Sequence, residues 1–270
     1  SSAINAMISM RGQAEDYDAW ESLGLPGWGW RDVLPVFREI EDHFLGDSEH
    51  HGTGGNWRVE PPRVSWPILD AVRDAAGELG IPSTDDFNTG NNEGAGYFHV
   101  NQKAGRRWSA ARGFLGPARS RPNLRIETGC LADRIEFDGR RAAALTFRQY
   151  GRAFRVSARA EIILCAGAIG SPQILQRSGL GPARVLADAG IETVAELPGV
   201  GANLQDHLQQ RAIYKVSGAQ TLNQSYHSPI GLAGMGFDYA VRRRGPLTMA
   251  PSQLGIFTRS DDTQNRPNIQ

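Results

Sequence analysis

Cysteine is scarce in this sequence, which has only Cys130 and Cys165 among 270 residues. Two cysteines cannot build a disulfide framework, and they cannot supply the four ligands of a structural zinc site on their own. Both stand in apolar runs of the sequence. We therefore interpret them as buried free thiols in a reducing compartment, and we expect a cytoplasmic protein.

Net charge and long apolar runs are also missing. The 29 basic and 29 acidic residues cancel, and the longest basic cluster, Arg242 to Arg244, has three residues, so nothing in the charge favours nucleic-acid binding. No run approaches the roughly 18 to 20 apolar residues that a transmembrane helix requires. With 40% hydrophobic and 21% charged residues, the composition indicates a soluble globular chain of one large domain or two small ones.

Three sequence features expected of an intact dinucleotide-binding protein are absent. The chain starts at Ser1 without an initiator Met or a signal-peptide pattern, and it stops at Gln270 without a capping or turn signal. No Gly-x-Gly-x-x-Gly stands between a strand and a helix, so a phosphate-binding βα turn of that kind is not found. We expect an internal piece of a longer protein.

Glycine, in contrast, is abundant at 32 residues, which predicts many tight turns. Apolar spacing predicts helices within 15–44, interrupted by a turn at 24–29, and over 67–80; residues 81–112 form a long irregular segment. Strands are predicted at 57–59, 124–128, 132–137, 142–149, 153–158 and 192–197. Asp138-Gly139 is a preferred two-residue hairpin turn between two of them.

The most informative stretch is 161–181. The continuous apolar run 161–167 predicts a strand buried inside a sheet, followed by Ser171 as the N-cap and Pro172 as the first residue of a short helix. Small residues at the strand end and free N–H groups at the helix start would suit an anionic ligand. An ordinary βα turn has the same small residues and helix cap, so the residues alone leave both interpretations open.

Residues 167–181, Gly-Ala-Ile-Gly-Ser-Pro-Gln-Ile-Leu-Gln-Arg-Ser-Gly-Leu-Gly, resemble the second signature of the glucose-methanol-choline (GMC) oxidoreductase family. The opening Ser1 to Ile8, with Arg11-Gly12 and 17–20, resembles the tail of the first signature; Ser9 departs from its usual aromatic or Ala. Further similar blocks lie at 26–28, 86–88, 105–112 and 198–207. The similarity covers nearly the whole chain and is nearest to the choline-dehydrogenase-like branch.

The resemblance implies an α/β fold: part of a doubly wound FAD-binding domain joined to a substrate domain with an antiparallel sheet. It assigns 1–60 to the FAD domain and front helices, 61–125 to a substrate-side segment, 126–210 to FAD-domain strands, and 211–270 to the start of the substrate sheet. Asn5, Ala6, Met7 and Ile8 would lie along the flavin ring. Ala132 would meet the adenine through its backbone, with an ordinary strand residue as the alternative.

The function implied by the resemblance is oxidation of an alcohol by hydride transfer to FAD, giving an aldehyde or ketone. The substrate is a small-molecule alcohol, with choline not singled out, and the electron acceptor is not assigned. We assign no catalytic residue, because the family's proton-abstracting His lies beyond Gln270, and we expect the 270 residues alone to be inactive. The alternatives are a family member with non-redox lyase chemistry and a non-catalytic truncated binding module.

None of the six histidines is assigned the role of the catalytic base, and no metal site is expected. His50-His51 resembles a surface loop without further ligands at metal spacing, and His207 is expected to hold its own loop. For His99, a binding role and a structural role stay equally open. Ser109 is expected to cap a helix start between two arginines, and Asp16 and Asp18 to be solvated acids of a first turn.

Overall fold

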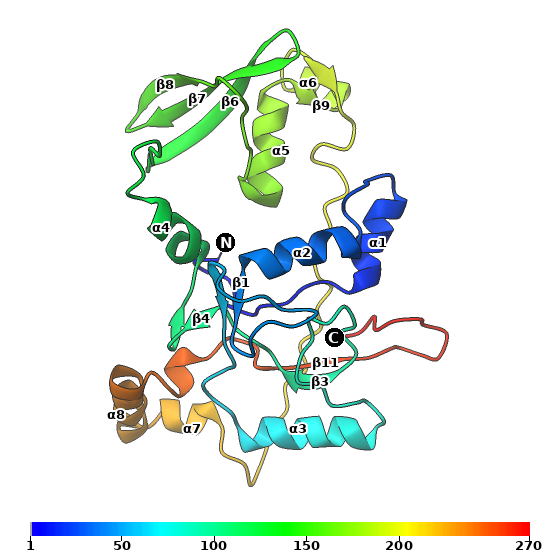
Figure 1. Cartoon of the computed structure of the whole chain (residues 1–270), viewed down its shortest axis with the longest axis vertical. Coiled ribbons are helices and arrows are strands. Elements are labelled where there is room, and N and C mark those ends of the chain that lie inside the picture. The colour runs from blue at the N-terminus through cyan, green and yellow to red at the C-terminus, as the bar shows by residue number, and fades with distance from the viewer. Residues whose placement is uncertain (1) are drawn as a thin grey trace. The chain divides into compact units, whose positions relative to one another are not determined.

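The computed structural model describes residues 2–270, and these form two compact units (Figure 1). Unit 1 contains residues 2–124 together with Lys215–Gln270, and unit 2 is Arg125–Tyr214. Helices and small, mainly antiparallel sheets alternate along the chain, which confirms the predicted α/β class. The predicted four-part domain division stays a prediction. No helix among residues 2–270 is long and apolar enough to cross a membrane.

The helices of unit 1 begin with a pair at the front of the chain, α1 (Ala14–Ser22) and α2 (Trp30–Ile40). Asp16 and Asp18, the two acids predicted in the first turn, accept hydrogen bonds at the helix starts. Asp16 accepts the N–H of Gln13 before α1 and pairs with Arg266, and Asp18 accepts the N–H of Trp30, the first residue of α2. The remaining helical elements are α3 (Pro67–Glu78), η1 (Ala111–Leu115), α4 (Gly116–Ala118), α7 (Leu222–Tyr226), α8 (Pro229–Phe237), η2 (Asp238–Arg242) and η3 (Pro246–Thr248).

Short strands link the segments of unit 1. Strand β1 (Glu41–His43) runs parallel to β2 (Trp57–Val59), β3 (Gly94–Tyr97) pairs antiparallel with β11 (Leu254–Phe257), and β4 (Gln102–Lys103) forms a hairpin with β5 (Arg106–Arg107). The predicted helix through residue 44 is therefore wrong beyond Ile40, where Glu41 turns to an extended conformation.

Val100 is a buried residue that connects two segments of unit 1. It forms isolated antiparallel bridges with both Ile8 and Glu60, so it joins the amino-terminal segment to the end of β2. Val100 packs with Met7 and Ala250 in a small buried cluster. A second group of packed side chains consists of Phe87, Phe98 and Phe257, with ring centroids 5.0 to 6.3 Å apart. The contacts of Val100 fix Met7 and Ile8 of the amino-terminal segment in place.

Unit 2 is built on one antiparallel sheet with the order β6 (Cys130–Asp138), β7 (Arg141–Gln149) and β8 (Arg152–Ser157). The hairpin turn lies at Gly139-Arg140, one residue later than predicted, because Asp138 still pairs with Arg141. No strand forms at 124–128.

The rest of unit 2 is a βα segment. It contains α5 (Gly167–Arg177), α6 (Ala183–Asp188) and the parallel pair β9 (Leu180–Gly181) and β10 (Ala195–Glu196). Helix α5 is tied to the sheet, because the Ser178 hydroxyl accepts the N–H of Ile135 at 2.8 Å. Only the short pair β9–β10 corresponds to the strand predicted at 192–197.

Three predictions about 161–172 and the cysteines are wrong. The run 161–166 has no hydrogen-bonded strand partner among residues 2–270, so it forms no strand, and the Ile163 side chain is 77% exposed. Cys165 in this run and Cys130 at the start of β6 are both exposed. Helix α5 begins at Gly167, which places Ser171 and Pro172 inside it; the Ser171 hydroxyl accepts the N–H of Ala166 rather than capping the first turn.

Helix formation after Ser109 starts where predicted, but the expected side-chain cap is absent from the described residues. The carbonyl of Ser109 accepts the N–H groups of Arg112 and Gly113, and no side-chain hydrogen bond caps η1. Ser109 itself is buried at 8% exposure. Its backbone, and not its hydroxyl, therefore starts this helical segment.

Candidate functional site

A hollow of about 210 Å³ lies in unit 1 between the amino-terminal segment, α2 and the strands. Its wall combines apolar and aromatic side chains with a few polar groups, which is the usual make-up of a small-molecule site. The lining residues are Asn5, Ile8, Ser9, Met10, Arg11, Phe37, Ile40, Glu41, Trp57 and Asn101.

The four residues predicted to lie along the flavin divide into two groups. Asn5 and Ile8 line the hollow. Met7 is buried at 8% exposure, and its side chain packs against Val100 and Ala250 in the core. Ala6, between them, is half-buried. The structure therefore brings the segment 5–8 to the hollow and places one of its side chains in the core beneath it.

A tight turn holds the segment 5–8 in place. Met7 adopts a left-handed conformation with φ of 62°, which a non-glycine residue rarely takes. The Asn5 carbonyl oxygen Oδ1 stabilises the turn, accepting the N–H of Met7 at 3.1 Å and Nη1 of Arg107 at 2.8 Å. The same Arg107 atom donates to the Ser2 carbonyl at 3.2 Å. Arg107 thus positions Asn5 at the wall of the hollow. The two bonds from its Nη1 atom are to the oxygens of Ser2 and Asn5.

Ala132 lies in unit 2, on β6, opposite Phe147 of β7. A register shift occurs between Ala132 and Arg134, which leaves the intervening backbone irregular. Ala132 is half-buried. The structure therefore places it on a strand, as predicted.

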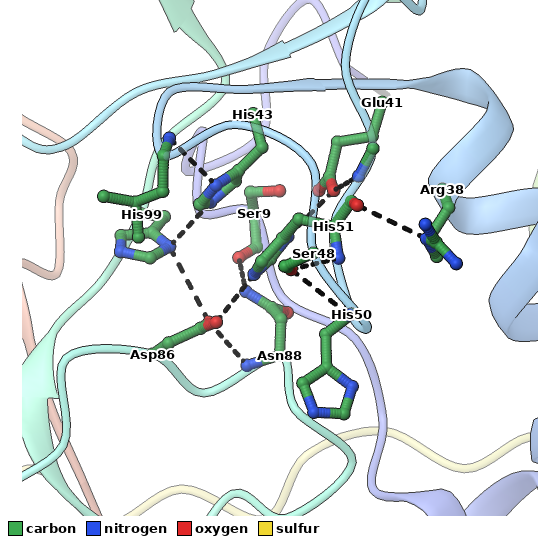
Figure 2. A network of polar contacts seen from close by, with 12 residues as sticks. Ser9, Arg38, Glu41, His43, Ser48, His50, His51, Asp86, Asn88 and His99 are labelled. Atoms are coloured by element: carbon green, nitrogen blue, oxygen red, sulfur yellow. Dashed lines mark hydrogen bonds and ion pairs between the residues drawn. The ribbon is translucent and has the colours of Figure 1, made fainter.

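A buried network of charges adjoins the hollow and shares Arg11 and Glu41 with its wall. Figure 2 shows its members Glu41, His51 and Asp86. The imidazole of His51 lies between two carboxylates, with Nδ1 at 2.8 Å from Glu41 and Nε2 at 2.6 Å from Asp86. Arg11 pairs with the same Glu41 oxygen at 2.9 Å, with both side chains less than 10% exposed. Two cations and two carboxylates thus balance each other, with Arg11, Glu41 and His51 buried and Asp86 partly exposed.

The carboxylates keep His51 protonated. Burial favours the neutral imidazole, but the hydrogen bonds and charges of Asp86 and Glu41 outweigh it and raise the pKa of His51 to about 9. Burial likewise opposes ionisation of Asp86, yet its bonds from His51 and the Asn88 N–H lower its pKa to about 2. The Glu41 pKa is lowered against the effect of burial by His51, Arg11 and the Gly52 N–H.

The second histidine of the network, His43, is neutral. Its ring stacks on that of His51, with centroids 3.6 Å apart and planes within 10°. Burial and the positive charge of His51 lower the pKa of His43 to about 4. Since Nδ1 accepts the Leu45 N–H at 3.4 Å, the proton resides on Nε2, which donates to Nδ1 of His99 at 3.3 Å. Burial lowers the pKa of His99 as well.

This arrangement suits a structural role for the histidines. Both nitrogens of His51 carry protons at neutral pH and donate to carboxylates, so this ring cannot accept a proton from a substrate. His43 and His99 use ring nitrogens on one another. No three His, Cys, Asp or Glu side chains in the chain from residue 2 onward form a metal-binding group.

The predicted surface position of His50-His51 is wrong for His51, which is only 4% exposed. The loop turns inward because the Ser48 hydroxyl accepts the N–H of His51 at 3.0 Å. The next residue must be glycine, since a Cβ on Gly52 would overlap the Arg38 carbonyl. His99 joins the same network. In contrast, His207 is exposed, and its backbone N–H donates to the Asp206 side chain.

Sequence reasoning missed most of this network. Glu41 and His43 were assigned to a helix, where polar residues normally face solvent. The resemblance marked Arg11 and 86–88 as family blocks, without indicating that they meet. Asn88 connects the block 86–88 to the amino-terminal segment, because its side chain accepts the Arg11 N–H at 2.7 Å and donates to the Ser9 carbonyl at 3.1 Å.

The fold and the hollow define a mixed α/β protein with a candidate ligand site beside its amino-terminal segment. The family model described as GMC oxidoreductase matches residues 1–209. The chain belongs to the GMC oxidoreductase family, as the signature resemblance predicted.

Similar proteins include the mitochondrial choline dehydrogenase of Homo sapiens, 39% identical over 273 residues, and the oxygen-dependent choline dehydrogenase of Stenotrophomonas maltophilia, 42% identical over 277. Both alignments cover the whole chain but 45% and 49% of the relatives, so the chain spans about half their length. A FAD-dependent oxidoreductase structure from Chaetomium thermophilum matches with a TM-score of 0.85 and 29% identity, over 95% of this chain and 48% of that one.

Proposed function

We propose that the whole protein is a FAD-dependent oxidoreductase that acts on the CH–OH group of a small-molecule alcohol. Family membership supports this proposal, and so do relatives named as choline dehydrogenases and a structural neighbour titled as FAD-dependent. The observation that carries it is the hollow in unit 1, because the first-signature residues Asn5 and Ile8 line it together.

The residues around the hollow fit a flavin ring. Ile8, Phe37 and Ile40 offer apolar surface to a flat aromatic system. Asn101, which is 4% exposed, also lines the hollow, and its amide nitrogen has no hydrogen-bond partner among residues 2–270. A hollow with apolar surface on part of its wall and an unused amide group is suited to a ring that carries hydrogen-bonding atoms on one edge.

Within this proposal, each predicted residue has a distinct part. Asn5 and Ile8 contact the ring from the wall, and Ala6 and Met7 present backbone between them. The buried side chain of Met7 keeps that backbone rigid. Ala132 meets the adenine through its backbone, which its alanine side chain does not hinder.

Bound FAD would supply a ring that accepts the hydride leaving the alcohol carbon, so that an aldehyde or ketone results. The hydroxyl proton must then go to a base. His51 cannot be that base, because its pKa is about 9 and both its N–H groups are donated. This chain's residues instead bind and orient: Arg107 fixes Asn5, and the Arg11–Glu41 pair holds the wall beside α2.

The compartment and the electron acceptor are less constrained. Two free cysteines are in keeping with the proposed cytoplasmic location. We assign no acceptor.

Anaerobic titration of the purified whole protein tests the proposal. We expect a flavin absorption spectrum that bleaches when a primary or secondary alcohol is added, with choline and benzyl alcohol among those tried. A protein without flavin, or a flavin that no alcohol reduces while dithionite does, would contradict this function. The latter result would favour non-redox chemistry on the same fold.

A further inference from the structure

The backbone of Asn101 is fixed on both sides. Its N–H donates to the Met7 carbonyl at 2.7 Å, and its own carbonyl accepts the N–H of Trp108 at 2.9 Å. The preceding residue, Val100, bridges Ile8 and Glu60. Three segments of unit 1 thus fix the backbone of Asn101, a residue that lines the hollow.

The side-chain amide has no such partner. Asn101 Nδ2 is buried without a hydrogen bond to any of residues 2–270. An unsatisfied buried polar group costs about 1 to 3 kcal/mol, so proteins rarely keep one without a use. A half-turn about the last side-chain bond exchanges the amide N and O, so either group can face a ligand.

Four side-chain amides among residues 2–270 have a buried atom without a partner, and Asn101 is the one of them that lines the hollow; the others are Asn92, Gln102 and Gln253. Asn88 uses both ends of its amide, on Arg11 and Ser9. Asn5 has its oxygen engaged by Met7 and Arg107. Gln102 also has a buried atom without a partner, Oε1, but its nitrogen is held by the Thr248 carbonyl and it does not line the hollow.

We propose that the Asn101 amide is a direct cofactor contact, which hydrogen-bonds to the polar edge of the flavin ring. This inference rests on the proposed function. A carboxamide presents a donor and an acceptor side by side, and the pyrimidine part of a flavin presents carbonyl and N–H groups in the same way. The apolar wall at Ile8 and Phe37 holds the rest of the ring.

Asn101→Leu in the whole protein tests the contact, because leucine has the same number and branching of side-chain heavy atoms and no hydrogen-bonding group. We expect FAD to bind about 10-fold more weakly, measured as the Kd by flavin fluorescence during titration of the FAD-free protein. The melting temperature of the FAD-free protein should not fall, since no protein hydrogen bond is lost. Asn101→Asp, which keeps the size and loses the donor, should also weaken FAD binding.

Asn88→Leu is the matched control. It removes the bonds to Arg11 and Ser9, so it should lower the melting temperature of the FAD-free protein. If Asn101→Leu lowers that temperature as much as Asn88→Leu does, Asn101 is structural and the inference is wrong.

An unchanged Kd for FAD in both Asn101 variants would also overturn the inference, and so would a changed KM for the alcohol with FAD affinity unaltered. These outcomes leave the proposed function standing. A wild-type protein that binds no FAD would instead overturn the proposed function and the inference together.

Discussion

Different kinds of contact stabilise the interior of each of the two units. The site region of unit 1 depends on polar bonds between residues far apart in the chain, such as His51 with Asp86 and Arg11 with Glu41. Unit 2 depends on hairpins between neighbouring strands, and every residue of β8 is exposed. The site region therefore concentrates its stability in a few buried charges, whereas the sheet of unit 2 distributes it over pairs of neighbouring strands.

Removing a carboxylate from each unit should expose this contrast most strongly. Glu41→Ala leaves Arg11 and His51 buried without their shared partner, so we expect a loss of about 3 to 5 kcal/mol in the free energy of unfolding. The control, Glu136→Ala, breaks the solvent-exposed pair with Arg155 and should cost about 1 kcal/mol or less.

Urea unfolding of both variants measures the difference. Equal losses would mean that the buried network is not what holds the site region.

The pH dependence of stability should differ in the same way. His51 has a folded-state pKa of about 9, so its contribution is complete below 6.5, the value for an exposed histidine, and is lost as pH rises through 9. His43, with a pKa of about 4, contributes fully above 6.5 and loses its contribution as pH falls through 4. Stability should therefore be greatest near pH 6.5.

Thermal unfolding between pH 4 and 9 checks this profile. His51→Gln should flatten the alkaline side, and His43→Gln should flatten the acid side down to about pH 4. A wild-type profile that rises steadily from pH 6.5 to 9 would show that His51 is not held as a cation.

The smallest effect is expected at Ser171 in unit 2. Since Ser171 lies inside α5 and accepts one exposed bond from Ala166, Ser171→Ala should cost about 0.5 to 1.5 kcal/mol and leave FAD binding unchanged. Urea unfolding and a FAD titration of the variant measure both. A larger loss with weaker FAD binding would indicate that the hydroxyl contacts a ligand.

Local patterns in the sequence predicted much of the fold. The apolar spacing located α1, α2 and α3, and alternation located β6 to β8, because hairpins and amphipathic helices depend on residues close in sequence. The strand at 161–167 failed for a physical reason: an apolar run becomes a strand only beside a partner, and periodicity does not show whether one is present.

The site was predictable only through resemblance. Signature residues indicated the segment 5–8, of which Asn5 and Ile8 line the hollow, and the flavin contact of this segment stays a prediction. The buried network escaped prediction because Glu41, His51 and Asp86 are polar residues in separate segments, and only the folded chain brings them together. Asn101 gave no signal, since its distinguishing property is the absence of a partner.

Hydrogen exchange of the whole protein, with and without FAD, tests most directly whether the hollow holds the flavin. We expect FAD to slow amide exchange in residues 2–11 and 99–103, while β8 (Arg152–Ser157) serves as the reference and stays unchanged. Exchange that slows elsewhere but not in these two segments would contradict the account, because the ring would then lie away from Asn5, Ile8 and Asn101.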